Sequence, residues 1–103
     1  MGAWIHILRC SDGSYYVGNT RRSVEVRVDE HNAGTFPGYT SARRPVTLVY
    51  SEYHDTLIAT FQRERQLKGW NRSKKEALIN GRTDLLPALS RRPAVQRRNP
   101  PRS

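Results

Sequence analysis

The strongest constraint on the fold is a pair of strand-forming segments near the N-terminus, separated by a short turn. Residues 4–9 and 15–18 are rich in aromatic and β-branched side chains, and residues 11–14 read Ser-Asp-Gly-Ser. Aromatic and β-branched residues favour strands, whereas Ser, Asp and Gly favour turns. The segment therefore predicts an antiparallel β-hairpin.

The register of this hairpin decides which side chains share a face. A two-residue Asp-Gly loop would place His6 and Tyr16 on opposite faces, whereas a three-residue loop with a left-handed Gly13 places them on one face. We predict the three-residue loop. One face then carries His6, Leu8, Tyr16 and Gly18, with Gly18 across from His6. The other face carries the core residues Ile5, Ile7, Tyr15 and Val17.

Capping and termination signals predict the later elements. Ser23 is a suitable N-cap for a helix that ends near residues 32–34, and Val46–Tyr50 resembles a third strand. Asp55 is expected to cap a second helix. The apolar periodicity gives that helix an inward stripe, with Ile58 and Leu67 beside it. The stripe comprises Leu57, Phe61, Glu64 and Lys68.

A third helix and a short last turn complete the expected fold. Ser73 and Glu76 have the spacing of a capping box, Gly81 follows Ile79, and a weak turn covers residues 84–89. The order β-β-α-β-α-α predicts an α+β domain over residues 1–89, with a small three-stranded antiparallel sheet flanked by helices. Residues 90–103, rich in Arg and Pro, are expected to be a disordered basic tail.

The charge balance favours a polyanionic partner. The 103 residues carry 18 Lys and Arg against nine Asp and Glu, and the tail contributes five of the arginines. The expected domain is therefore basic without its tail, which favours nucleic acid. The alternative is that the net charge only keeps the protein soluble.

The sequence favours a reducing compartment. Its single cysteine, Cys10, allows no internal disulfide. No apolar run approaches the roughly 20 residues that span a bilayer, and residues 1–4 lead directly into a strand pattern. We expect a cytoplasmic protein with no membrane partner.

Glu64 is an unusual residue for an apolar stripe. A carboxylate there loses solvation energy unless it is paired or coordinates a cation. One interpretation is an ion pair with Lys68 or Arg27. The other is a metal ligand, because Mg²⁺ is often held by one carboxylate together with water and phosphate oxygens.

Arg27 and His31 lie one helical turn apart on the face that also carries Val24 and Val28. A guanidinium can bind a phosphate through two hydrogen bonds and stabilise charge that develops on it. Each residue also has an ordinary interpretation, a solvated arginine or a structural histidine. The shared face favours a functional role.

Taken together, these segments resemble the GIY-YIG nuclease superfamily from Trp4 to Ile79. The resemblance is greatest to small stand-alone bacterial members grouped with YhbQ and the N-terminal catalytic domain of UvrC. Several short motifs match in the right order. They are residues 4–18, Arg27 with residues 30–32, residues 38–40, 43–46 and 48–50, and residues 63–70 with 74–79.

The resemblance implies a metal-dependent endonuclease that uses Mg²⁺ or Mn²⁺. It implies that Tyr16 is the base that activates water, Arg27 the phosphate ligand and Glu64 the metal ligand. It also implies that His31 is a supporting polar residue and that Gly18 lets the substrate approach. Asn19 stands where some relatives carry a lysine or histidine that assists the base.

His6 departs from the family, because it replaces the tyrosine of the GIY element. Imidazole has an ordinary pKa near 6.5 and tyrosine about 10, so imidazole is the better base at neutral pH. We therefore expect His6 to orient Tyr16 or to accept the proton of the attacking water.

Further basic residues are candidates for contacts with the nucleic-acid backbone. They are Arg43, Arg44, Arg65, Lys68, Arg72, Lys74 and Lys75.

The main interpretation is that the protein is an endonuclease that hydrolyses phosphodiester bonds in DNA. It would act at branched, damaged or otherwise distorted sites in repair or recombination. RNA is the alternative polymer. Two alternatives belong to other classes: a nucleic-acid-binding module with impaired catalysis, and a domain that binds another protein.

Overall fold

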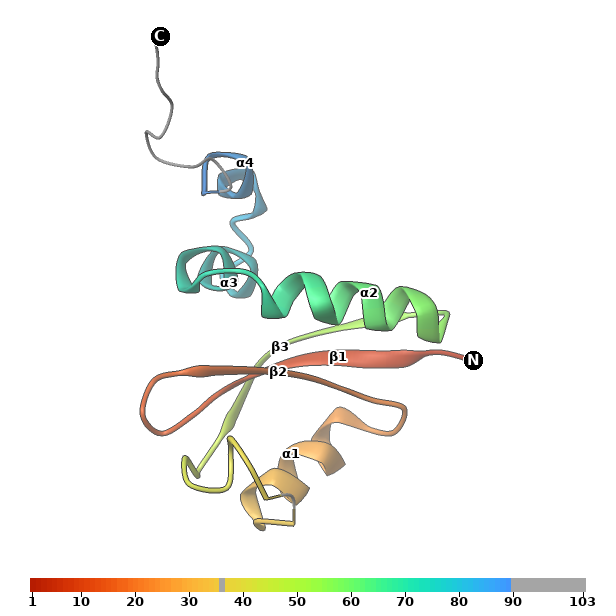
Figure 1. Cartoon of the computed structure of the whole chain (residues 1–103), viewed down its shortest axis with the longest axis vertical. Coiled ribbons are helices and arrows are strands. Elements are labelled where there is room, and N and C mark those ends of the chain that lie inside the picture. Colours follow the sequence, from red (N-terminus) through yellow and green to blue (C-terminus); the bar gives the residue numbers. More distant parts are fainter. Residues whose placement is uncertain (36, 90–103) are drawn as a thin grey trace, which may run out of the picture. The chain divides into compact units, whose positions relative to one another are not determined.

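The computed structural model describes residues 1–35 and 37–89, so the predicted tail lies outside the described residues. The elements of Figure 1 follow the order β1, β2, α1, β3, α2, α3, η1, α4. Their bounds are β1 Ala3–Arg9, β2 Tyr15–Thr20, α1 Val24–Asn32, β3 Thr47–His54, α2 Leu57–Lys68, α3 Arg72–Ile79, the 3₁₀ turn η1 Thr83–Leu85 and α4 Leu86–Leu89. The chain divides into two compact units, residues 1–69 and the segment from Trp70 onward.

The first unit contains a three-stranded antiparallel sheet in the order β2-β1-β3, as expected for the predicted α+β class. Strand β2 is therefore at an edge. Helix α1 contacts β1 and β3, and α2 contacts all three strands. Figure 1 shows α1 and α2 on opposite sides of this sheet.

The hairpin register follows the three-residue loop. Leu8 lies opposite Tyr16 and His6 lies opposite Gly18. Gly13 has a φ of 86°, a left-handed conformation that glycine adopts without steric cost, and its N–H donates to the Cys10 carbonyl at 2.9 Å. The prediction that His6 and Tyr16 share a face is confirmed.

The two faces of the sheet have different partners. Ile5, Ile7 and Val17 are buried on the α2 side. On the α1 side, Leu8, Cys10 and Val46 form a buried apolar cluster, against which Tyr16, Val28 and Leu48 pack. The sheet is thus covered on both faces, as an α+β unit of this size requires to bury its apolar side chains.

Helix α1 begins where its cap predicts. Ser23 Oγ accepts a hydrogen bond from the Val26 N–H, and the helix ends before Gly34, whose φ is 76°. The last residue of α1, Asn32, binds the backbone of Val46, directly before β3. Its side chain accepts from the Val46 N–H at 2.7 Å and donates to the Val46 carbonyl at 3.1 Å.

Three expectations about β3 and α2 were wrong. Strand β3 runs to His54 rather than Tyr50, and Thr56 rather than Asp55 caps α2. The inward stripe also differs, because Phe61 is half exposed, Lys68 is exposed and Thr60 is fully buried. The Thr60 hydroxyl donates to the Thr56 carbonyl at 2.8 Å, so it can be buried without losing a hydrogen bond.

In the second unit, the predicted capping box is absent. Asn71 caps α3 by accepting from the Lys74 N–H at 2.9 Å, and Glu76 pairs with Arg72 instead of reaching back to Ser73. Gly81, with a φ of 72°, follows α3, and the weak last turn is present as η1 and α4. None of the helices in the described part of the chain is long and apolar enough to cross a membrane.

Candidate active site

His6, Tyr16 and His31 form a cluster of rings on the α1 side of the sheet, called the ring cluster. The His6 ring centroid is 6.1 Å from that of His31 and 6.4 Å from that of Tyr16, and the Tyr16 and His31 centroids are 5.3 Å apart. A Cβ atom at Gly18 would lie 2.8 Å from His6 Cε1 and 3.0 Å from Tyr16 Cε2. Glycine at position 18 therefore leaves the space that the His6 and Tyr16 rings occupy.

His6 is held neutral at ordinary pH. Its side chain is fully buried, and within residues 1–35 and 37–89 neither ring nitrogen has a hydrogen-bond partner. Burial, followed by the positive charges of His31 and Arg27, lowers its pKa to about 4, whereas the Glu64 carboxylate acts in the opposite direction. The ordinary pKa of imidazole therefore does not apply to His6, and the expectation that His6 accepts the proton of the attacking water at neutral pH is wrong.

His31 projects from α1 into the same cluster. It is buried, and its Nδ1 shares a 2.8 Å hydrogen bond with the Thr40 hydroxyl. Burial and the nearby Arg27 charge lower the pKa of His31, against an opposing effect of Glu30. Thr40 thus fixes the orientation of the His31 ring from the loop that follows α1.

Arg27 lies one helical turn before His31, as expected. Its Nη1 is 3.6 Å from Glu30 Oε1, and Glu30 Oε2 lies 2.6 Å from Arg22 Nη2. The Arg27 side chain is 26% exposed, so a solvent-borne anion can reach it. Its positive charge lowers the pKa of both His6 and His31.

Glu64 approaches the cluster from the other face of the sheet. Its Oε1 accepts a hydrogen bond from Asn19 Nδ2, and its Oε2 lies 2.8 Å from Lys68 Nζ. Asn19 follows Gly18 on the edge strand, and successive strand side chains point to opposite faces. The carboxylate therefore lies at the edge strand on the α2 side of the sheet, opposite the ring cluster, and its charge acts to raise the His6 pKa.

Glu64 suits a metal ion that takes few protein ligands. In the described residues, no group of three or more His, Cys, Asp and Glu side chains is placed to hold a metal. The Glu64 side chain is only 14% exposed, and Asn19 orients it. The ion pair with Lys68 is also present, but that lysine is 55% exposed and can turn into solvent. A single oriented carboxylate fits Mg²⁺, which usually keeps several waters.

Two predicted nucleic-acid contacts lie in the loop before β3. Arg43 lies with its Cζ 4.0 Å from the centroid of the Tyr39 ring and donates to the Tyr39 carbonyl and to Asp12. Tyr39 in turn stacks beside Tyr16, with centroids 6.1 Å apart. Arg43 is therefore connected to the ring cluster through an exposed tyrosine.

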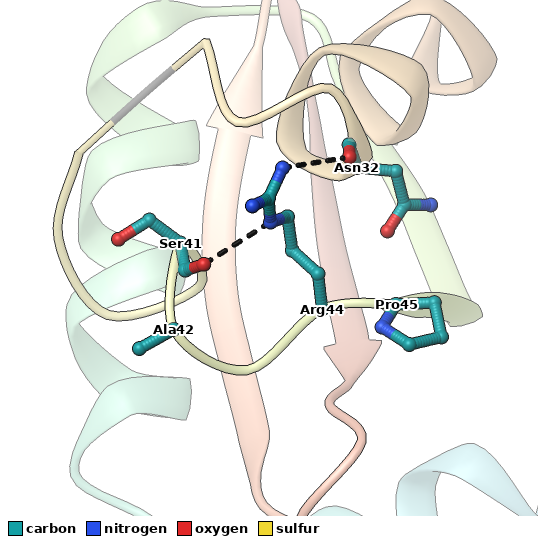
Figure 2. Close-up of a pocket in the computed structure, with 5 residues that line it drawn as sticks. All are labelled: Asn32, Ser41, Ala42, Arg44 and Pro45. Atoms are coloured by element: carbon teal, nitrogen blue, oxygen red, sulfur yellow. Dashed lines mark hydrogen bonds between the residues drawn. The ribbon is translucent and has the colours of Figure 1, made fainter.

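Arg44 anchors its own loop. Its guanidinium donates to the carbonyls of Ser41 and Asn32 at 3.1 and 3.2 Å, as Figure 2 shows. Gly34 leaves room for it, since a Cβ there would lie 2.6 Å from Arg44 Nη1. Asn32, Ser41, Ala42, Arg44 and Pro45 line an open pocket of about 450 Å³, and none of them belongs to the ring cluster.

The other basic candidates lie on helices. Arg65 and Lys68 are exposed on α2. Arg72, Lys74 and Lys75 lie on α3 in the second unit, where Arg72 pairs with Glu76 and Lys74 Nζ lies 4.9 Å from the centroid of the Trp70 ring. Burial lowers the pKa of Lys75.

Sequence reasoning missed two residues that contact the ring cluster. Neither Thr40 nor Tyr39 was assigned a role, although both lie in one of the family-like motifs, Gly38-Tyr39-Thr40. That motif was the available signal. A threonine and a tyrosine in a loop carry no periodicity that points to a site.

Comparison with known proteins supports the family resemblance. A family model described as the GIY-YIG catalytic domain matches residues 2–77. A UPF0213 protein of Haloquadratum walsbyi is 45% identical over 82 residues, which cover 80% of this chain and 91% of the relative. A UPF0213 protein of Staphylococcus aureus is 43% identical over 79 residues, covering 77% and 95%.

Two solution NMR structures resemble this fold. The UPF0213 protein BH0048 from Bacillus halodurans has a TM-score of 0.51 and 34% identity, covering 78% of this chain and 84% of that one. The protein EF2693 from E. faecalis has a TM-score of 0.55 and 31% identity, covering 79% and 85%.

Proposed function

Because the chain belongs to the GIY-YIG catalytic domain family, we propose that it is a metal-dependent endonuclease that hydrolyses phosphodiester bonds in DNA. We further propose that it acts on branched, damaged or otherwise distorted DNA during repair or recombination, in the reducing cytoplasm that its single cysteine favours. RNA is the alternative polymer.

The observation that supports this proposal is the cluster of His6, Tyr16 and His31 rings on one face of the sheet, with Glu64 hydrogen-bonded to Asn19 on the edge strand. Tyr16, His6 and His31 form the ring cluster, and the charges of Arg27 and Glu64 both affect the His6 pKa. A site with a phenol, a guanidinium and a carboxylate beside a glycine has the groups that phosphodiester hydrolysis requires.

The proposed mechanism is in-line attack by water. Tyr16, after releasing its own hydroxyl proton to solvent, accepts the proton of the water as a phenolate. Arg27 binds the phosphate and stabilises the negative charge that develops on its oxygens. His31, oriented by Thr40, supports the Tyr16 ring. Buried and neutral, His6 packs beside Tyr16 and holds its ring in place.

The metal would be held by Glu64, with Asn19 orienting the carboxylate. When bound, Mg²⁺ or Mn²⁺ supplies Lewis-acid polarisation of the phosphate and stabilises the leaving oxygen. Arg43, Arg44, Arg65 and Lys68 are proposed contacts with the DNA backbone, together with Arg72, Lys74 and Lys75 of the second unit.

Cleavage of plasmid and branched DNA with Mg²⁺ or Mn²⁺ tests the proposal. We expect Arg27→Ala and Glu64→Gln to lose cleavage by at least about 100-fold, the scale of removing one group that stabilises the transition state. Arg63→Ala is the control for Arg27, since it is also a helix arginine paired with a glutamate, and the two side chains are 24% and 26% exposed. Glu76→Gln is the control for Glu64, since each carboxylate has an i,i+4 ion pair. Full cleavage by Glu64→Gln would refute the assignment of the metal ligand.

A second candidate function is a nucleic-acid-binding module with impaired catalysis. His6 in place of the family tyrosine and the pairing of Glu64 with Lys68 favour it. DNA binding without cleavage under either metal would establish this alternative. If His6→Phe cleaves DNA as fast as the parent at every pH, His6 has no part in the chemistry.

A further inference from the structure

An exposed pair of aromatic side chains lies on the sheet outside the ring cluster. Trp4 and Tyr53 are partners in the β1–β3 register, and their rings are in edge contact with centroids 5.3 Å apart. Trp4 is 37% exposed and Tyr53 is 50% exposed. Contiguous exposed apolar surface rimmed by polar residues is a feature of interaction sites.

This pair shares the face of the sheet that carries the ring cluster. Trp4 precedes His6 by two positions on β1, so both side chains point to the same side. Opposite them on β2, Thr20 pairs with Trp4 and Gly18 pairs with His6. One two-residue step along the strand, roughly 7 Å, therefore separates the aromatic pair from the candidate active site.

The aromatic rings are held in place before any ligand arrives. A Cβ atom at Gly2 would lie 2.6 Å from Tyr53 Oη and 2.0 Å from the His54 carbonyl oxygen. The N-terminal backbone thus packs closely against Tyr53, and Trp4 contacts it from β1. A surface with little side-chain freedom to lose on binding is suited to recognition.

Basic residues lie where β2 leaves this end of the sheet. Arg21 and Arg22 directly follow Thr20, the partner of Trp4, and the Arg22 side chain is 67% exposed. Aromatic surfaces beside cations are typical of sites that bind single-stranded nucleic acids, where bases stack and phosphates pair with arginine. The basic charge of the chain favours such an occupant over an acidic or purely apolar one.

We propose that Trp4 and Tyr53 form a stacking platform for the unpaired bases of a nucleic-acid strand that continues into the candidate active site. This inference rests on the proposed nuclease function. Bases inside a duplex have both faces covered by their neighbours, whereas unpaired bases offer a free face to an aromatic ring. The protein is therefore expected to bind unpaired strands in preference to duplex of the same length.

The test is a binding measurement without metal, so that it does not depend on cleavage. Fluorescein-labelled dT15, rU15 and a 15-base-pair duplex are titrated with the full chain at about 100 mM salt, and binding is followed by anisotropy. We expect tighter binding of at least one unpaired strand than of the duplex, and the two single strands show whether DNA or RNA is preferred.

Substitutions of the aromatic side chains test whether a ring at Tyr53 is needed for binding. Tyr53→Thr is expected to weaken binding of the preferred strand about 5- to 150-fold, the range that stacking of one base provides, whereas Tyr53→Phe retains the ring and the affinity. Phe61→Ala is the matched control, because Phe61 is also 50% exposed but lies on α2 at the other side of the sheet. In a Trp70→Phe background, quenching by dT15 or rU15 reports on Trp4 alone.

Unchanged affinity in Tyr53→Thr, or a loss equal to that in Phe61→Ala, overturns the inference and leaves the aromatic pair to a protein partner. Tighter binding of the duplex overturns it as well. A chain that fails to cleave any DNA but shows the Tyr53-dependent binding retains the platform and loses only the proposed nuclease activity.

Discussion

Replacing His6 by Phe should flatten the dependence of folding stability on pH. In the native protein, burial and the charges of His31 and Arg27 lower the His6 pKa to about 4, while the unfolded chain returns it to the ordinary 6.5. Between these two values the unfolded state binds more protons than the native state. Stability is therefore greatest above about pH 6.5 and is lost as the pH falls toward 4.

The size of this effect follows from the difference between the two pKa values. Each unit corresponds to about 1.4 kcal/mol, so the full effect approaches about 3 kcal/mol and most of it, about 2–3 kcal/mol, is lost between pH 7.5 and 4.5. His31, whose pKa is also lowered, contributes in the same direction in both proteins. The difference between parent and variant isolates His6.

Urea denaturation at a series of pH values, followed by circular dichroism, provides the measurement. Between pH 7.5 and 4.5, the free energy of unfolding of the parent should fall by about 2–3 kcal/mol more than that of His6→Phe. Nuclear magnetic resonance of the His6 Cε1 proton should show no titration between pH 8 and about 5. Parallel stability curves, or a titration midpoint near 6.5, would refute the reasoning that burial holds His6 neutral.

Three further changes test the packing around the site. Gly18→Ala should lower stability by about 1–3 kcal/mol, because the new Cβ would lie 2.8 Å from His6 Cε1, and a thermal melt checks it. Thr40→Val should cost about 1–3 kcal/mol by leaving His31 Nδ1 without its hydroxyl, while Thr40→Ser keeps most of the stability; an equal loss in both variants would contradict this. Arg44→Ala should lower stability by about 1 kcal/mol by removing two hydrogen bonds to loop carbonyls, which urea denaturation measures.

The elements that are specified by residues close together in the sequence, such as turns and helix caps, were predictable. The hairpin register follows from Gly13 and the alternation of side chains, and α1 begins at Ser23 because a serine hydroxyl there accepts the Val26 N–H. The inward stripe of α2 was not predictable in the same way. Hydropathy favours Phe61 over Thr60, but the Thr60 hydroxyl bonds to the Thr56 carbonyl, so the smaller residue is buried and the larger one remains half exposed.

The amino-acid sequence by itself determined the order of the elements, the shared face of His6 and Tyr16, and the family whose chemistry the motifs indicate. Only the tertiary structure decided that Glu64 reaches the edge of β2 from the opposite face, through Asn19, a residue 45 positions away. It also decided that His6 is sealed from solvent and that Thr40 orients His31. The physical reason is that turns and caps depend on neighbours in the chain, whereas burial and long-range hydrogen bonds depend on which surfaces pack together.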